Sequence, residues 1–570
     1  MDGRSTETPF SARLGAWLRS HRPELLAALL LLAVLPMRDL WAPDEPDFAQ
    51  CVKEMRLRGE WLLPYLNGQP YSEKPILYYW VMKASAQILD TLTGGLGFSH
   101  GVAAWALRLP SALAAVAFLS AFRRWAARFL QPGLAEPAAW ILATTPLWFW
   151  QSQFIQIDLL FAALLAWSWL CWLGGYLLLG RPPEAVEAGE SRRWFLKAYF
   201  WLALAFLAKG PLAPVLSMLL LLVFLGWQRD FRVLARTHLL AGLGITLLIV
   251  APWYLAAGIR GGASYAYELI VHQNLERATR AWDHLQPWWK YGEYLLGDFF
   301  PWVLLLPAAG LHLRRECRLA DPAWRFLLLA FLVPLVFLSL VQSKQGKYLL
   351  MAHPFLALLI ADLFHQLDAH RTRRLGGLLA GGLGILAAVL AALVLGAGGP
   401  RLQAQIAPFL GPLRLLALVL TCGTLFVLIQ ALRGKAAALI PGTALSLALL
   451  YLVGGTWGFR RLDPSKSYRR WTTAVQPLIA GRPVFYWQTL RSGVMVYTDH
   501  LMPELRSAKA LESLDPEARL VAQRDEWEQD AWGMMPALRA RFEVLLAVPT
   551  GGDEILLLKK RPDPMPEEAP

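Results

Sequence analysis

Long apolar runs separated by short charged segments make up most of the chain. The runs lie near residues 24–37, 109–122, 136–151, 159–180, 195–208, 211–227, 239–256, 299–313, 324–342, 348–366, 376–397, 411–432 and 436–457. A helix needs about 20 apolar residues to cross the hydrocarbon core of a bilayer, and several of these runs are shorter. The pattern predicts a polytopic α-helical membrane protein with about 13 transmembrane helices, and it excludes a β-barrel, whose strands alternate apolar and polar residues.

Positive charge is distributed unevenly among the loops that connect these runs. The basic clusters are Arg123/Arg124/Arg128, Arg192/Arg193, Arg229/Arg232/Arg236, Arg314/Arg315/Arg318, Arg371/Arg373/Arg374 and Arg433/Lys435. All of them fall on one side of the membrane if the N-terminus is cytoplasmic, as the positive-inside bias requires. We therefore expect a cytoplasmic N-terminus and two long outer loops, 38–108 and 258–298.

Three apolar segments need separate treatment. The run at 24–37 follows a basic leader, but no small-residue cleavage site comes after it, so we interpret it as an uncleaved first helix. Lys83 interrupts the amphipathic run Lys74–Leu89, which we expect to lie at the membrane interface. Residues 196–227 are expected to form two short spans, because Lys209-Gly210-Pro211 breaks the helical pattern.

The apolar runs end near Arg460. Short β-type stretches follow at Val484–Trp487, Val494–Tyr497, Val544–Val548 and Ile555–Leu558, with helical patterns between them. We expect a transmembrane domain over residues 1–459 and a small α/β domain over residues 460–570 on the periplasmic side.

Composition supports a membrane location. The 570 residues are 56% hydrophobic and 17% charged, which is too apolar for a soluble chain of this length. Basic cytoplasmic loops account for the net charge of +13, so this charge does not indicate a nucleic-acid partner. The four cysteines form no CxxC pair, which argues against a disulfide framework or a thiolate metal site.

Carboxylates in the expected outer loops are the first candidates for chemistry. Asp44 and Glu45 follow the first helix closely, and they either act in catalysis or cap the helix that begins there. Asp158 lies in a short outer connection among apolar residues. A carboxylate at that depth is costly, which makes Asp158 a functional candidate.

Six cations fall on the same outer side, against the prevailing charge bias. They are Lys74, Lys209, Arg277, Arg280, Lys344 and Lys347. For Lys344 and Lys347 the alternative is snorkelling from a helix end, whereas Lys209 interrupts an apolar hairpin, where a lysine is costly. Carboxylates and cations on one membrane face suit a reaction in which a base activates a hydroxyl while a phosphate leaving group gains charge.

Several of these residues belong to a series of motifs. The first outer loop carries Asp44-Glu45, Glu54-Met-Arg, Gly59-Glu-Trp, Pro64, Asn67-Gly, Tyr71 and Glu73-Lys74-Pro75. Further motifs are Arg108-Leu-Pro-Ser, Asp158, Phe206-Leu-Ala-Lys209-Gly, Pro252-Trp-Tyr, His272-Gln-Asn with Arg277, Pro287-Trp-Trp-Lys-Tyr, Pro301-Trp, and Ser343-Lys344 with Tyr348. This series, over residues 38 to about 360, resembles the protein O-mannosyltransferase and 4-amino-4-deoxy-L-arabinose lipid A transferase superfamily of GT-C membrane glycosyltransferases.

The resemblance implies an inverting transfer of a sugar from a polyprenyl-phosphate donor to a lipid or protein acceptor. It places the reaction at the periplasmic face of the bacterial inner membrane, among membrane lipids, and requires no cofactor. Asp44 would be the leading catalytic carboxylate, while Glu45 and Asp158 would position the acceptor or substrate. The residues that would meet the donor phosphate are Lys74, Lys209, Lys344, Tyr348 and, as a weaker candidate, Arg277. A divalent metal near Glu73, Asp158 and His272 is compatible with the resemblance, although a structural or hydrogen-bonding role for His272 is favoured.

The chain departs from the family pattern at two places. Pro46-Asp47-Phe48 follows the acidic pair where members acting on lipid A have a small residue, Arg and Tyr. Ser343-Lys344-Gln345-Gly346-Lys347 replaces the familiar Ser-Lys-Leu-Pro stretch, and this change allows Lys347 to take over from Lys344. The departures leave the sugar open.

Two functions from other classes remain as alternatives. A transporter or flippase for polyprenyl-linked sugars explains a broken helix at Lys209-Gly210-Pro211, but it predicts repeated halves, which the sequence does not show. A cell-envelope scaffold explains the spans and gives no reason for acids and lysines on one face.

Overall fold

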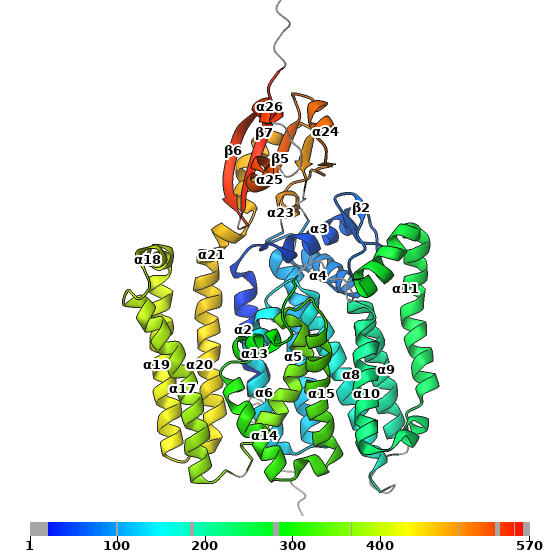
Figure 1. The fold of residues 1–570 in the computed structure, drawn as a ribbon, viewed down its shortest axis with the longest axis vertical. Coiled ribbons are helices and arrows are strands. Elements are labelled where there is room, and N and C mark those ends of the chain that lie inside the picture. The colour runs from blue at the N-terminus through cyan, green and yellow to red at the C-terminus, as the bar shows by residue number, and fades with distance from the viewer. Residues whose placement is uncertain are drawn as a thin grey trace, which may run out of the picture. The chain divides into compact units, whose positions relative to one another are not determined.

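The computed structural model describes residues 21–98, 101–182, 187, 189–276, 284–365, 367–488, 491–529, 536–551 and 553–562. The chain folds into two compact units (Figure 1). The helical unit comprises Met1–Leu35, Glu73–Tyr78 and Arg108–Gly458, and the mixed unit comprises Pro36–Ser72, Tyr79–Leu107 and Phe459–Pro570. Most of the expected first outer loop therefore clusters with the C-terminal segment.

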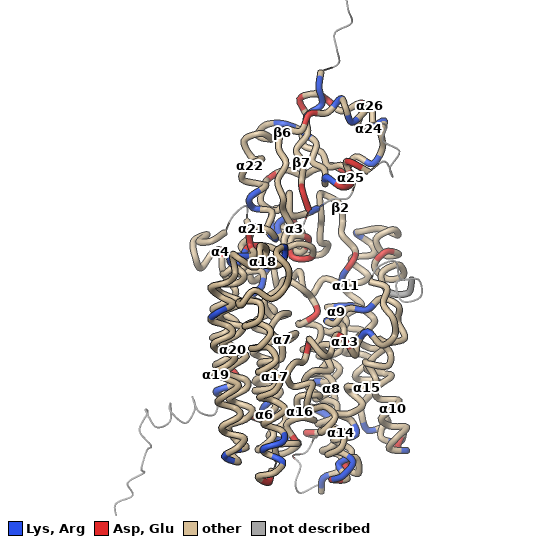
Figure 2. Tube along the Cα trace, turned by 60° about the vertical axis from the view of Figure 1, so that its left-hand side comes forward, with Lys and Arg blue, Asp and Glu red and all other residues tan. Residues whose placement is uncertain are grey.

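Helices of very different length build the helical unit. They are α2 (Arg22–Val34), α5 (Ala104–Phe129), α6 (Pro132–Ala143), α7 (Pro146–Ser152), α8 (Ile157–Leu179), α9 (Glu190–Lys209), α10 (Leu212–Gln228), α11 (Leu239–Tyr267), α13 (Lys290–Asp298), α14 (Leu306–Arg315), α15 (Pro322–Leu340), α16 (His353–Asp362), α17 (Ala369–Val394), α18 (Pro400–Ile406), α19 (Leu410–Leu432) and α20 (Leu439–Val453). Short 3-10 or π segments include η3 (Phe231–Arg236), η4 (Glu268–Glu276), η5 (Trp302–Leu305), η7 (Gly346–Ala352) and η10 (Gly454–Gly458). Charged residues gather toward the ends of these helices and are sparse along them (Figure 2), as expected where charge in hydrocarbon is costly.

Seven helical segments in the described part of the chain are long and apolar enough to cross a membrane. They are Ala104–Phe129, Ile157–Leu179, Leu239–Gln273, Pro322–Leu340, Ala369–Val394, Pro400–Leu432 and Ala436–Lys466. The pair Lys290–Asp298 and Trp302–Arg315 would add an eighth, but it bends by 112° at its break. The polytopic helical membrane fold is confirmed. The total of 13 spans stays a prediction, because runs such as α2 and α10 form helices shorter than a full span.

The predicted break within residues 196–227 is confirmed. α9 ends at Lys209, Gly210 adopts a φ of 83°, and α10 begins at Leu212. Glycine reaches a positive φ without the steric cost that a Cβ imposes. The break places Lys209 at the C-terminal end of α9, where the helix dipole favours a cation.

α8 is a central helix of this unit, and it lies alongside α9 (Figure 1). Trp172 in its middle packs against Phe195, Phe224 and Phe326 from three other helices, with ring centroids 5.8 to 6.0 Å away. A helix that is apolar on all sides is expected to be buried on all sides, and α8 is. This packing fixes the position of Asp158 in its first turn.

The mixed unit is built around a five-stranded sheet of order β4-β3-β5-β7-β6. The strands are β3 (Val484–Trp487), β4 (Glu504–Leu505), β5 (Arg519–Gln523), β6 (Phe542–Thr550) and β7 (Asp553–Lys560). β3 pairs in parallel with β4 and β5, while β7 pairs antiparallel with β5 and β6. The remaining elements are α3 (Asp44–Leu57), β1 (Tyr65–Leu66), β2 (Gln69–Pro70), α4 (Leu77–Thr93), α21 (Phe459–Lys466), α22 (Arg469–Ile479), α23 (Gly493–Val496), α24 (Ala508–Glu512), α25 (Arg524–Glu528) and α26 (Pro536–Ala540).

Alternate residues of the central strands enter separate hydrophobic clusters. Tyr486 and Val521 belong to one cluster, whereas Trp487 and Leu520 belong to the other. This separation follows from the period of two in a strand, which points successive side chains to opposite faces. Both faces of the sheet are therefore covered.

One of the predicted strands is wrong. Val494–Tyr497 begins in a helical turn, α23, rather than in a strand. All four of these residues are buried, and the Val496 N–H donates to the Ser492 carbonyl at 3.1 Å. Buried backbone N–H and C=O groups need hydrogen-bond partners, and a helical turn supplies these partners within the segment itself. Val484–Trp487 is confirmed as β3, and the last two predicted stretches lie within β6 and β7.

Candidate active site

A network of ion pairs lies at the start of α8. Asp158 is 4% exposed, and its carboxylate pairs with the ammonium of Lys209 and, at 3.7 Å, with that of Lys347. Lys74 also acts on this carboxylate electrostatically, and it pairs with Glu73 at 3.9 Å. Three lysines thus face two carboxylates, so we define these five side chains as the cationic group, with a net positive charge.

The termini of two helices and one short turn assemble the cationic group. Asp158 lies in the first turn of α8 and Lys209 in the last turn of α9, so each charge has the sign that its helix dipole favours. Lys347 and Tyr348 come from η7, and the Lys209 ammonium lies 4.5 Å from the centroid of the Tyr348 ring. A cation over an aromatic face is attracted by the ring quadrupole, so Tyr348 helps to hold Lys209 in place.

Lys344 lies three residues from Lys347 but has a different environment. Its ammonium donates to the carbonyl oxygens of Gln286, at 3.0 Å, and of Val341. Its backbone N–H donates to the carbonyl of His284 at 3.0 Å. Burial lowers the pKa of Lys344. Lys344 therefore ties two loop segments together, and the geometry favours Lys347 as the lysine of this stretch that faces Asp158.

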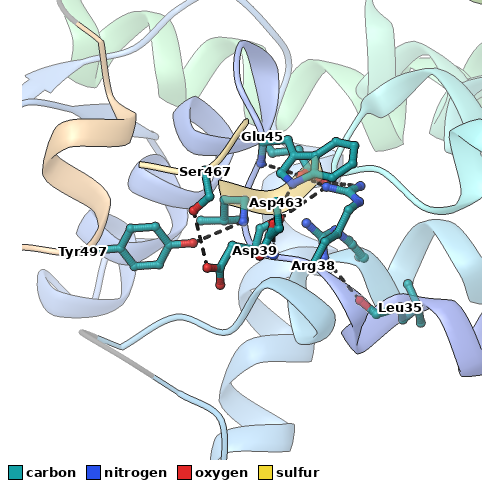
Figure 3. Close-up of polar contacts among 10 residues, drawn as sticks. Leu35, Arg38, Asp39, Glu45, Asp463, Ser467 and Tyr497 are labelled. Atoms are coloured by element: carbon teal, nitrogen blue, oxygen red, sulfur yellow. Dashed lines mark hydrogen bonds and ion pairs between the residues drawn. The ribbon is translucent and has the colours of Figure 1, made fainter. Parts of the chain in front are cut away.

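In the mixed unit, Glu45 is held at the start of α3 (Figure 3). Its side chain and that of Arg38 are each 1% exposed, and the guanidinium binds the carboxylate through two nitrogens, one of them at 3.1 Å. The backbone N–H of Trp41 donates to the same carboxylate at 2.9 Å. A charge this deeply buried is tolerated because it is paired and hydrogen-bonded. Glu45 thus shapes the segment that precedes α3.

Asp44 is the neighbouring carboxylate and differs from Glu45 in exposure. It is the first residue of α3 and is half-buried. The segment before it is fixed by Asp463, which accepts from the Trp41 indole N–H at 2.7 Å and from the Asp39 backbone N–H at 2.9 Å (Figure 3). Tyr497 accepts from the Leu40 backbone N–H at 3.1 Å. Asp44 therefore extends from a tightly braced turn.

Glu54 organises the rest of the first loop, a role that the motif alone did not reveal. Its carboxylate accepts from the backbone N–H groups of Asn67, at 2.7 Å, and Gly68, at 2.9 Å. Asn67 and Gly68 have φ values of 52° and 80° between β1 and β2, as expected for an Asn-Gly hairpin turn. The Asn-Gly pair was the available sequence signal, but it gave no indication of which carboxylate would bind it.

Lys83 is a further departure from expectation. Its helix, α4, forms as predicted, yet the Lys83 side chain is fully buried and donates to the carbonyls of Met55, at 2.9 Å, and Glu60, at 2.6 Å. The same ammonium lies 4.2 Å from the Trp61 ring centroid. Lys83 is therefore an internal brace of the mixed unit.

The remaining predicted site residues do not form a metal site. His272 pairs with Glu268 at 3.8 Å, and Glu73 pairs with Lys74. Among the described residues, no group of three or more His, Cys, Asp and Glu side chains gathers where it could hold a metal. Arg277 and Arg280 lie outside the described residues. Among the described residues, this donor set does not fit a metal ion.

Comparisons with known proteins show which families the chain resembles. Residues 73–255 match the model of the dolichyl-phosphate-mannose-protein mannosyltransferases. The undecaprenyl phosphate-alpha-4-amino-4-deoxy-L-arabinose arabinosyl transferase of Pseudomonas paraeruginosa is 33% identical over 384 residues, which cover 65% of this chain and 64% of that protein. A transferase of the same name from Pseudomonas fluorescens is 31% identical over 337 residues, 58% of this chain and 55% of that protein. The chain thus aligns with between about half and two thirds of these relatives' length.

Solved structures share the fold over nearly the whole chain. ArnT from Cupriavidus metallidurans, solved with undecaprenyl phosphate bound, superposes with a TM-score of 0.73 at 21% identity, covering 95% of this chain and 98% of that one. The Archaeoglobus fulgidus oligosaccharyltransferase superposes with a TM-score of 0.52 at 10% identity, covering 93% and 73%. The predicted motifs, the family model and the shared fold agree. The chain is thus similar in sequence to the protein mannosyltransferases and the aminoarabinose transferases, and it shares its fold with ArnT.

Proposed function

We propose that this protein is an inverting glycosyltransferase that moves a sugar from a polyprenyl-phosphate donor to a lipid A-like acceptor at the periplasmic face of the inner membrane. The observation that carries the proposal is the cationic group. A net positive cluster at the start of a buried helix is a site for an anion. The relatives that are named for an undecaprenyl phosphate-linked sugar supply the class of anion.

The cationic group would act on the leaving phosphate. As the bond between the sugar C1 and the phosphate oxygen breaks, negative charge accumulates on the polyprenyl phosphate. Lys209, Lys347 and Lys74 would stabilise this charge, and a fixed ammonium is far more effective in a water-poor site than in water. Asp158 would hold two of these lysines in place, and Tyr348 would support Lys209.

Asp44 would act on the acceptor. It would remove the proton from the acceptor oxygen while that oxygen forms a bond to the sugar C1 on the face opposite the departing phosphate. Attack on the opposite face inverts the configuration at C1. Its greater exposure supports Asp44 over Glu45 as the base, because Arg38 and the Trp41 N–H already bind the Glu45 carboxylate. Glu45 would then position the acceptor only indirectly, through the turn that it holds.

A matched pair of variants tests this assignment. Asp44→Asn should lower transfer by a factor on the order of 10² to 10⁴, because an amide cannot accept the proton. Asp47→Asn makes the same change three residues later in α3 and should retain most of the activity. Purified full-length protein in nanodiscs would be given an aminoarabinosyl or a mannosyl polyprenyl phosphate, with lipid A or an acceptor peptide. Equal turnover by well-folded Asp44→Asn would overturn the assignment.

The match to the mannosyltransferase model supports a second candidate, a protein O-mannosyltransferase-like activity. The same assay distinguishes the two, since label on the peptide from the mannosyl donor supports the second candidate. A polyprenyl-sugar transporter would consume neither donor. The periplasmic placement of residues 460–570 and the cytoplasmic N-terminus belong to this proposal, and the charge clusters of the sequence support them.

A further inference from the structure

A short loop of the mixed unit, residues 496–502, is bonded to the chain on both sides of α3. We call it the α23 loop, because it begins at the last residue of α23. Before α3, the backbone N–H of Leu40 donates to the hydroxyl of Tyr497 at 3.1 Å (Figure 3). After α3, the side-chain amide of Asn67 donates to the carbonyl of Met502 at 2.7 Å and accepts from its N–H at 2.9 Å. The first outer loop is therefore tied to the α23 loop at two points far apart in its sequence.

Lys53 makes a third connection, from within α3 itself. Its side chain is 3% exposed, and its ammonium donates to the carbonyl oxygens of Val496, at 3.3 Å, and Thr498. The largely exposed carboxylate of Asp499 lies 3.5 Å from the same ammonium. α23 packs directly against α3 at this position (Figure 1). The helix that carries Asp44 is thus held from its own interior face by the α23 loop.

A buried lysine is an unusual means of attaching a helix. Removing an ammonium from water is costly unless hydrogen bonds replace the lost hydration, as the carbonyls of the α23 loop do for Lys53. An apolar side chain of similar volume often stabilises such a position equally well. A fully bonded polar network instead restricts the structure to one arrangement, because its bonds are directional. The bonds of Lys53 therefore indicate a requirement for the exact position of α3 rather than for stability alone.

We propose that the α23 loop holds Asp44 in the position from which it acts on the acceptor, with Lys53, Tyr497 and Asn67 as positioning residues. This inference rests on the proposed glycosyltransferase function, in which Asp44 is the base. A base removes a proton only within hydrogen-bond reach of it, and a displacement of about 1 Å can lower a rate by about 100-fold. The C-terminal part of the mixed unit would thus contribute to catalysis through α3.

The test measures kcat and the donor KM of the full-length protein in nanodiscs. The donors are an aminoarabinosyl and a mannosyl polyprenyl phosphate, each with lipid A or an acceptor peptide. Lys53→Met keeps most of the length of the side chain but removes its hydrogen bonds to the α23 loop. It should lower kcat by on the order of 10- to 100-fold, because the base is displaced. The donor KM should stay unchanged, since the donor phosphate is assigned to lysines of the helical unit.

Lys560→Met is the matched control. Lys560 lies on β7 of the same unit and is 6% exposed, and its ammonium donates to the carbonyls of Glu512 and, at 3.1 Å, Leu514. The variant therefore loses the same kind of buried bonds, but to α24 and the turn after it instead of the α23 loop. It should keep the parent's kcat. A purely structural role for Lys53 would instead make the two variants alike in activity as well as in thermal unfolding.

Two milder variants test the other connections and replace Lys53→Met if that variant does not fold. Asn67→Gly removes both bonds to Met502, while glycine retains the φ of 52° at this position without steric cost. Tyr497→Phe removes the hydroxyl that accepts from Leu40 and keeps the ring. Each should lower kcat and leave the donor KM unchanged.

Four outcomes would overturn the inference. The parent's kcat in folded variants of Lys53 and Asn67 would show that these bonds do not position the base. Equal losses of activity in Lys53→Met and Lys560→Met would show that only general stability matters. A raised donor KM with an unchanged kcat would place these residues in donor binding. Turnover of no donor by the parent would refute the proposed function, and the inference would fall with it.

Discussion

Asp158→Asn should bind a polyprenyl phosphate more tightly than the parent protein does. It should also turn over the glycosyl donor more slowly. The Asp158 carboxylate neutralises part of the charge on Lys209 and Lys347. Asparagine has nearly the same shape but no charge, so the variant gains a full positive charge in the cationic group. An anion that binds these lysines then loses the repulsion from a carboxylate, while the lysines lose the partner that orients them.

The magnitude follows from the geometry. The Lys347 ammonium lies 3.7 Å from the carboxylate, so a phosphate on its far side would be about 8 Å from Asp158. With an effective dielectric constant of about 20, two unit charges at that separation interact by about 2 kcal/mol. Removing this repulsion corresponds to roughly 30-fold tighter binding. Breaking the buried ion pair should also lower the free energy of unfolding by about 3 kcal/mol. This value is at the low end of the usual range for buried ion pairs, because both lysines are partly exposed.

Calorimetry with short-chain polyprenyl phosphate, at low and high salt, measures the affinity of full-length protein in nanodiscs. Asp362→Asn is the matched control, since Asp362 is also buried but pairs with His312 and Arg318. It should be similarly destabilised, with no change in phosphate affinity. Unchanged or weaker phosphate binding by folded Asp158→Asn would refute the assignment of these lysines to the donor phosphate.

Three further predictions concern the lysines at 344 and 347, the Arg38–Glu45 pair and the membrane topology. Lys347→Ala should weaken donor binding and turnover by at least about tenfold, the effect of losing one hydrogen bond to a charged group, whereas Lys344→Ala should mainly lower the thermal unfolding temperature; a donor defect confined to Lys344→Ala would reverse the two roles. Glu45→Gln should destabilise the mixed unit by about 3 kcal/mol, because it removes the carboxylate that pairs with the buried Arg38; the double variant with Arg38→Gln should lose less than the sum, and strict additivity would argue against the pair. Reporters fused after Arg124 and Arg236 should be active in the cytoplasm and one fused after Pro570 in the periplasm, and periplasmic activity at either of the first two positions would contradict the threading.

The sequence specified those parts of the fold that depend on local pattern. The helix break at Gly210 and the strand β3 could be predicted because a glycine-proline pair and a run of β-type residues act locally. The strand predicted at Val494–Tyr497 was wrong because four buried apolar residues suit a helical turn as well as a strand. Tertiary neighbours, not propensity, decide between the two.

The candidate site shows a similar division. The predicted location of acids and lysines on one side of the membrane pointed to Asp158 and Lys209. A charge that interrupts an apolar hairpin has few structural explanations. The difference between Lys344 and Lys347 could not be predicted. The first lies in a loop and the second in the turn η7, and only the path of the backbone shows that one ammonium meets carbonyls and the other meets Asp158. The binding of Glu45 by Arg38 likewise depends on how a seven-residue segment turns.

Transfer of a sugar from a polyprenyl phosphate with inversion is tested most directly by NMR of the product. The donor would carry a sugar labelled with 13C at C1, and the full-length protein and a lipid A acceptor would be reconstituted in liposomes. The label should appear on the acceptor with the opposite anomeric configuration, and Asp44→Asn should not form this product. A product with retained configuration would contradict the inverting mechanism, and an intact donor moved across the bilayer would show that the protein is a transporter.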